Sequence, residues 1–145
     1  MKQAGPVKRW SDGTPLLATV QEPWAIAASE RWVRVMAEND APGLWDATGC
    51  ARIPECLPIS ATLQDRIRRW QLWYDDLDEL NTSFPEPMYW EQRDDMPIAA
   101  FNAEGRAIGR AIKTELPSNW TVIVVDVDAW LRDDDDSELI LRPGD

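Results

Sequence analysis

The residues best placed to carry out chemistry are two aspartates at the end of an apolar run. Val122 to Val125 are typical of a buried strand, and Asp126 and Asp128 follow it. Phosphoryl-transfer enzymes place carboxylates at such strand ends, where they hold Mg²⁺ or attack phosphorus. Those enzymes build a large domain after this strand, whereas 17 residues follow Asp128, and the sequence has no Gly-x-x-x-x-Gly-Lys-[Ser/Thr] phosphate loop. We therefore expect a strand that emerges into solvent, and we keep metal-dependent phosphoryl transfer by Asp126 and Asp128 as an alternative function.

Other catalytic and metal-binding patterns are missing from the sequence. The chain has no histidine, which excludes Ser-His-Asp and Cys-His relays and histidine-ligated metals. The run Asp133, Asp134, Asp135 and Asp136 lacks the Asp-x-[Asp/Asn]-x-[Asp/Asn]-Gly spacing of a calcium loop. We expect no enzymatic activity, no cofactor and no metal site. The acidic run is then either a solvated loop or a contact surface for a cationic partner.

The cysteines and the N-terminus point to one compartment. Cys50 and Cys56 are too few for a disulfide-dependent fold or a zinc site. The first 14 residues contain four charged side chains and no apolar run, and no stretch approaches the ~20 apolar residues of a membrane-spanning helix. We expect a cytoplasmic protein with reduced thiols.

Negative charge is concentrated in the second half of the chain. Residues 1–69 carry a net charge of +1, and residues 70–145 carry −12, which gives −11 for the whole protein. Such a field repels nucleic acid and membrane headgroups, and it attracts basic proteins.

The sequence contains nine tryptophans in 145 residues. Four are expected in the core because of their positions on a helix stripe or in strands: Trp32, Trp45, Trp70 and Trp120. Trp73 lies one step off the stripe, Trp90 lies in a proline-bounded loop, and Trp130 lies beside the acidic run. Tryptophan is strongly enriched in interface hot spots. We expect Trp90 to be exposed, because the loop around it has no pattern that would bury it.

An amphipathic helix is predicted over residues 61–80. Ser60 is a favourable N-cap, and the apolar stripe follows steps of three and four residues: Leu63, Ile67, Trp70, Tyr74 and Leu77. The polar face ends in four carboxylates: Asp75, Asp76, Asp78 and Glu79. Carboxylates in a last helical turn oppose the helix dipole, which marks this helix end as a place where function constrains the sequence.

A second amphipathic helix is predicted over residues 97–116. Its stripe has the same spacing: Ile98, Phe101, Gly105, Ile108 and Ile112. Gly105 and Gly109 lie four residues apart, so this face could let another backbone approach closely.

The strands complete an α+β fold class. We predict strands at 32–37 and 44–46 that pair as a short N-terminal hairpin, a central strand at 120–128 and an edge strand at 138–142. Other expected segments are an edge strand at 16–20, a short helix or turn at 25–30 and an irregular connection at 47–58. We expect one small domain over 1–145, with loosely ordered ends at 1–14 and 143–145.

Three motifs resemble those of a known group of proteins. They are Leu44-Trp45-Asp46-x-x-Gly49, Leu57-Pro58-Ile59-Ser60-x-x-Leu63-x-x-Arg66-Ile67-x-x-Trp70, and Phe101-x-x-Glu104-Gly105-x-Ala107-Ile108. With the order hairpin, helix, helix, strand over about 32–127, the chain is similar to small bacterial proteins of the toxin-immunity type, which are encoded beside polymorphic or contact-dependent toxins. The resemblance implies a small acidic toxin-binding protein and no catalytic residue.

The leading hypothesis is a protein-binding inhibitor that neutralises a basic bacterial toxin through an acidic, Trp-containing surface. Nucleic acid and membranes are not expected partners. The predicted partner-binding residues are Asp75, Asp76, Asp78, Glu79, Trp90, Asp133, Asp134, Asp135 and Asp136. Besides the enzyme alternative, a non-catalytic adaptor whose acidity serves solubility stays open.

Overall fold

The structure is a computed structural model that describes residues 31–85, 88–132 and 134–145. In chain order the helices and strands are β1 (Trp32–Val35), β2 (Leu44–Trp45), β3 (Ala51–Arg52), η3 (Pro54–Cys56), α1 (Ala61–Thr82), η4 (Trp90–Gln92), α2 (Ile98–Glu115), β4 (Thr121–Val125), η5 (Ala129–Leu131), η6 (Asp135–Ser137) and β5 (Glu138–Leu141). The predictions for 1–14, 16–20 and 25–30 lie outside the described residues.

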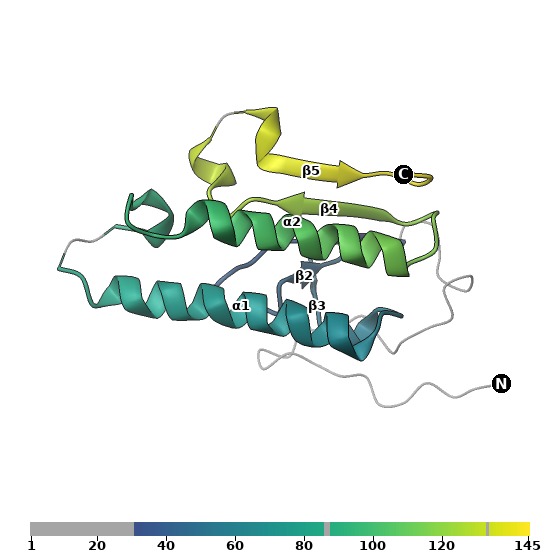
Figure 1. The fold of residues 1–145 in the computed structure, drawn as a ribbon, viewed down its shortest axis with the longest axis horizontal. Coiled ribbons are helices and arrows are strands. Elements are labelled where there is room, and N and C mark those ends of the chain that lie inside the picture. Colours follow the sequence, from purple (N-terminus) through teal and green to yellow (C-terminus); the bar gives the residue numbers. More distant parts are fainter. Residues whose placement is uncertain (1–30, 86–87, 133) are drawn as a thin grey trace.

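Within the described residues, five strands form one mixed sheet in the order β3-β2-β1-β4-β5 (Figure 1). β1 pairs with β4 in parallel, with Val33 opposite Val122 and Val35 opposite Val124. β2 is antiparallel to β1, which confirms the predicted hairpin, and β5 is antiparallel to β4 at one edge. β4 is therefore an inner strand, and its alternate residues Val122 and Val124 are buried.

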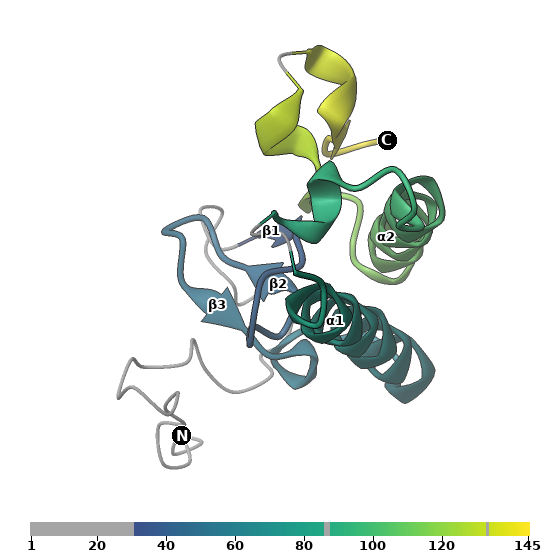
Figure 2. The ribbon, with the colours of Figure 1, turned by 90° about the vertical axis from the view of Figure 1, so that its left-hand side faces the viewer.

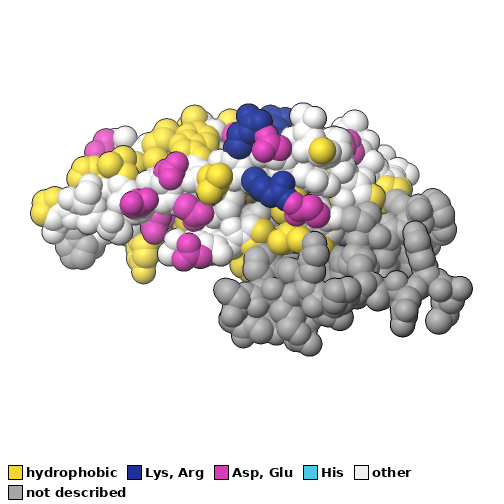
Figure 3. Space-filling model, turned by 90° about the horizontal axis from the view of Figure 1, so that it is seen from below, with side chains coloured by type: hydrophobic (Ala, Val, Ile, Leu, Met, Phe, Trp, Pro, Cys, Tyr) yellow, Lys and Arg dark blue, Asp and Glu magenta, His cyan; other side chains and the backbone are white. Residues whose placement is uncertain are grey.

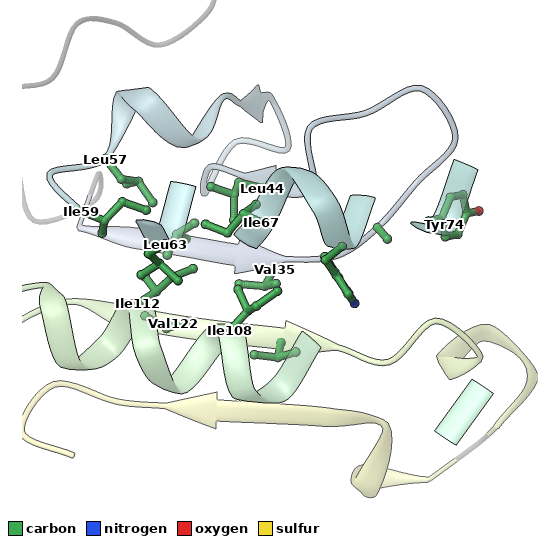
Figure 4. Packing of buried hydrophobic residues seen from close by; sticks show 14 of the residues in the cluster. Val35, Leu44, Leu57, Ile59, Leu63, Ile67, Tyr74, Ile108, Ile112 and Val122 are labelled. Carbon is green, nitrogen blue, oxygen red and sulfur yellow. The ribbon is translucent and has the colours of Figure 1, made fainter. Parts of the chain in front are cut away.

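Both helices lie on one face of the sheet, as the views in Figures 1 and 2 agree. The Ser60 hydroxyl accepts the backbone N–H of Leu63 at 3.2 Å, which satisfies an unpaired donor at the start of α1. The rings of Trp70 and Phe101 stack with centroids 4.9 Å apart, and the Trp70 indole N–H donates to the Phe101 carbonyl. The predicted stripes of both helices are buried there against the valines of the sheet, except for Ile98, which is half-buried. Figure 4 shows part of this core: Leu63, Ile67, Ile108, Ile112, Val35 and Val122.

The glycines of α2 allow close packing, but against side chains. A Cβ atom on Gly105 would lie 2.7 Å from Cζ2 of Trp70, and one on Gly109 would overlap Cγ2 of Val124. The expectation of a backbone contact is therefore wrong. The missing side chains instead let α2 approach α1 and β4 at the same time.

The three motifs noted in the sequence have structural roles. Oδ1 of Asp46 accepts the backbone N–H of Thr48 at 2.8 Å and that of Cys50 at 3.0 Å, and Gly49 has a φ of 87° in the same turn. In the other two motifs Arg66 of α1 and Glu104 of α2 form a two-pronged ion pair, with an N–O distance of 2.7 Å.

The α+β prediction is confirmed, with small shifts of boundary. The helices predicted at 61–80 and 97–116 span Ala61–Thr82 and Ile98–Glu115, and the strand predicted at 120–128 ends at Val125. The connection at 47–58 contains β3 and η3, which are too short to produce a periodic pattern. Cys50 and Cys56, both described, are not joined by a disulfide. None of the described helices combines the length and the apolar character that crossing a membrane requires.

Candidate functional site

A groove of about 380 Å³ opens where the parallel strands β1 and β4 end. Segments that are far apart in the sequence form its walls. The residues that matter most are Glu38 after β1, Val127 after β4, Tyr74 on α1, Tyr89 and Glu91 around η4, and Trp130 on η5. The carboxyl ends of neighbouring parallel strands are a usual place for a binding site, because the following loops diverge there.

Two exposed aromatic rings line this groove. The rings of Tyr89 and Trp130 meet edge to face, with centroids 5.4 Å apart and an interplanar angle of 83°. They are 65% and 56% exposed, respectively. Gln92 holds Tyr89 in place through two hydrogen bonds. The side chain of Gln92 accepts the Tyr89 backbone N–H at 3.1 Å, and the backbone N–H of Gln92 donates to the Tyr89 carbonyl at 3.0 Å. The pair forms a right-angled aromatic corner open to solvent.

Glu91 brings a buried carboxylate to the same groove. The residue is 8% exposed, and burial raises the pKa of its carboxyl group, although a hydrogen bond from Tyr74 acts in the opposite direction. Among the described residues, no lysine or arginine forms an ion pair with Glu91. Burial and nearby carboxylates also raise the pKa of the Tyr74 hydroxyl. This wall of the groove therefore carries negative charge that no described cation balances.

Unbalanced acidic residues extend from the groove over the end of α1. We call this the acidic surface: Glu38, Asp40, Asp75, Asp76, Asp78, Glu79 and Glu91. In the described part of the chain none of them forms an ion pair. Figure 3 shows acidic side chains gathered over the C-terminal half of α1, with the basic ones over its other half.

Hydrogen bonds attach the β1–β2 connection to the acidic end of α1. The side chain of Gln71 accepts the backbone N–H of Glu38 at 3.3 Å and donates to its carbonyl at 2.7 Å. Oδ1 of Asp75 accepts the backbone N–H of Asp40 at 3.3 Å. Asp40 has a φ of 57°. Burial raises the pKa of the Asp75 carboxyl group. Glu38 and Asp40, which sequence reasoning missed because they lie in a turn, thus join the predicted cluster.

Asp126 and Asp128 belong to an ion-pair network, so the expectation of a strand end in solvent is wrong for Asp126, which is 5% exposed. Its Oδ1 accepts Nε of Arg106 at 3.0 Å, and its Oδ2 accepts Nη2 of Arg106 at 2.9 Å and Nη2 of Arg132 at 3.0 Å. Oδ1 of Asp128 accepts the side-chain amide of Asn102 at 2.9 Å. These contacts fasten the turn that carries Trp130 to α2.

The described part of the acidic run, residues 134–136, lies on the other side of the groove from α1. Figures 1 and 2 both place η4 between α1 and the turns η5 and η6. Oδ2 of Asp134 lies 3.6 Å from Nε of Arg132, so this carboxylate has a basic neighbour, and the carbonyl of Asp136 accepts from Arg106. Asp133 lies outside the described residues. The two acidic segments predicted to form one site therefore flank the groove.

The prediction that Trp90 is exposed is wrong. It is 0% exposed, and its ring packs edge to face against Phe101 and Tyr74, with centroid distances of 5.6 Å and 5.4 Å. The short helix η4 turns this side chain into the core while its neighbour Tyr89 points outward. A single helical turn is too short to produce a periodic pattern, so the inward orientation of Trp90 could not be predicted from the sequence.

A larger hollow of about 510 Å³ lies between α1, η3 and residues Ala41 and Pro42. It contains the ion pair of Arg68 and Glu55, so its charges are partly balanced. Its exposed apolar side chain is Leu72. We regard the smaller groove as the candidate site because it combines open aromatic rings with unbalanced carboxylates.

Comparison with known proteins gives one match. A family model described as "Serratia CdiI immunity protein-like" matches residues 31–127, which is more than half of the chain. No curated protein and no solved structure matches the chain.

Proposed function

This chain belongs to the Serratia CdiI immunity protein-like family, and we propose on that basis that it neutralises a cognate toxin by binding to a basic surface of it. The observation that carries the proposal is the acidic surface beside an open groove. A protein that blocks a nucleic-acid-cleaving or translation-inhibiting toxin meets a positively charged face, because such toxins need one to hold nucleic acid.

The acidic surface suits fast capture of such a partner. Carboxylates without internal cations leave their field available to steer a basic protein during diffusion. The four predicted carboxylates at the end of α1 are all at least partly open to solvent, and Asp76 and Glu79 are exposed. We propose Asp75, Asp76, Asp78 and Glu79 as contacts on one side of the groove and the run 133–136 as contacts on the other.

Trp130 and Tyr89 replace Trp90 as the proposed aromatic anchors. Trp90 is inaccessible, whereas the two exposed rings already stand at the groove. Interface hot spots are enriched in Trp and Tyr, because these rings bury a large area at a low entropic cost.

The test uses the cognate toxin domain, which we expect to be encoded by a neighbouring gene. We expect Asp76→Lys with Glu79→Lys to slow association by roughly three- to tenfold at low salt and by less at high salt, because steering is screened over ~10 Å at 0.1 M. Both side chains are exposed, so the free energy of unfolding should hardly change. Stopped-flow fluorescence measures the association rate, and denaturant melts measure stability.

The control is Asp145→Lys. Asp145 is exposed, and the backbone N–H of its neighbour Gly144 donates to the carbonyl of Ser118, at the end of β4 away from the groove. This variant should associate at close to the wild-type rate. Because the double variant changes the net charge twice as much as the control, slowing by the control of half that size on a logarithmic scale would mean that net charge, and not this surface, sets the rate.

A further inference from the structure

We propose that the groove between β1, β4 and η5 receives one arginine side chain of the partner, with its guanidinium group against the Tyr89–Trp130 corner and the Glu91 carboxylate. This inference rests on the proposed function and names the chemistry that the groove selects. A volume of about 380 Å³ suits one long side chain better than a whole helix or strand.

The aromatic corner supplies one half of the recognition. A cation within about 6 Å of a Trp or Tyr ring is attracted to the electron-rich face of that ring. The rings of Tyr89 and Trp130 stand at 83° to each other, so a group in the corner can contact both. A planar guanidinium group also stacks on such a face, which an ammonium group does less well.

The carboxylate supplies the other half. Glu91 is more than nine-tenths buried, lines the groove and has no ion-pair partner among the described residues. A buried carboxylate without a cation lowers the stability of the free protein, as the raised pKa of Glu91 indicates. An incoming guanidinium group would remove that penalty and hydrogen-bond the carboxylate.

The basic residues of this end of the protein are already engaged. Arg106 and Arg132 both donate to Asp126, which also lines the groove. Asp126 is thus balanced from within and does not attract a further cation. The same ion pairs hold η5, and therefore Trp130, in position. The charge left for a partner is that of Glu91, with Glu38 nearby in the groove wall.

The first experiment uses small probes and the full chain. N-acetyl-arginine amide carries the guanidinium group, and N-acetyl-citrulline amide is its neutral analogue of the same shape. NMR spectra would follow the indole N–H signal of Trp130, assigned with Trp130→Phe. We expect saturable shifts with the arginine probe in the millimolar range, and weaker binding of the citrulline probe by about fivefold or more.

Matched variants locate the probe. Glu91→Gln keeps the shape and hydrogen-bonding capacity of the side chain but removes its charge, and it should weaken the arginine probe about fivefold or more. Glu115→Gln makes the same chemical change at an exposed position at the end of α2, outside the groove, and should leave probe binding nearly unchanged. Equal binding of both probes, equal effects of both variants, or no saturable shift would each overturn the proposal.

The second experiment separates this inference from the proposed function. In the complex with the cognate toxin domain, Trp130→Ala and Glu91→Gln should each raise the dissociation rate about tenfold or more. Wild-type dissociation in both variants would contradict the arginine site while leaving toxin neutralisation intact. If the toxin domain does not bind the wild-type protein, the proposed function fails, and the probes still decide whether the groove binds a guanidinium group.

Discussion

At the scale of single residues, the least expected feature is the carboxylate of Glu91. It lies in the short helix η4, which sequence patterns leave unassigned, and it is buried beside Tyr74. Because the carboxylate is buried without a described cation, it lowers the stability of the free protein and offers a binding group to a partner. The same residue therefore connects stability with recognition.

This cost predicts a pH dependence. Because the pKa of Glu91 is raised by burial, the folded protein holds this proton more tightly than the unfolded chain. Its contribution to stability is thus most favourable below the ordinary value of 4.5, and it falls as pH rises through the folded pKa. Glu91→Gln should be more stable than wild type at neutral pH, and the difference should shrink toward pH 4. Thermal melts across this range, with Glu79→Gln as control, measure the effect; a pH-independent difference would contradict it.

Asp126 has a different role from the one its position in the sequence suggests. Enzyme chemistry would need its oxygens free for a metal or a phosphoryl group, but both oxygens accept hydrogen bonds from arginines. Sequence alone could not show this, because Arg106 lies 20 residues earlier on α2. We assign Asp126 to positioning the turn that carries Trp130.

Asp126→Asn tests that assignment. The change should lower the free energy of unfolding by about 1–3 kcal/mol, the range for charge-assisted hydrogen bonds, and it should increase the mobility of Trp130. Denaturant melts measure the stability, and the 19F NMR line width of the 5-fluorotryptophan signal assigned to position 130 measures the mobility. Metal-dependent phosphate release by the wild-type protein that disappears in this variant would instead support the enzyme alternative.

At the scale of helices and strands, the spacing of apolar residues in the sequence predicted α1, α2 and β4. The stripes of α1 and α2 and the alternation of β4 follow directly from one-sided packing. The two-residue strand β3 and the single turn η4 lack such a period, and Trp90 was misplaced for that reason. The carboxylates at the end of α1 were predicted correctly as a cluster on that helix. Their neighbours Glu38, in a turn, and Glu91, in η4, are brought there only by the tertiary fold.

The glycine face of α2 gives a prediction at this scale. Gly109→Ala would place a Cβ atom against Cγ2 of Val124, so the helix must shift from β4. We expect a loss of about 1–3 kcal/mol from overpacking, although alanine favours a helix by about 1 kcal/mol over glycine. Arg110→Ala, at the next and exposed position, should change stability by less than about 0.5 kcal/mol. Denaturant melts decide, and a gain in stability at position 109 would contradict the packing described for α2.

At the scale of the whole molecule, the net charge of −11 is not spread evenly. Several carboxylates of the second half are balanced by arginines within the fold, including Glu104, Asp126 and Asp128. The residues of the acidic surface are not balanced in this way within the described chain. Part of the charge asymmetry read from the sequence is therefore concentrated beside one groove, which a count of charges alone could not locate.

The measurement that tests toxin neutralisation most directly is the association of the wild-type protein with its cognate toxin domain, at low and high salt. We expect a one-to-one complex that abolishes toxin activity, and an association rate that falls steeply between about 0.01 M and 0.15 M salt, as the Debye length shortens from about 30 Å to about 8 Å. No complex, or a complex whose association rate does not respond to salt, would contradict an acidic surface that captures a basic toxin.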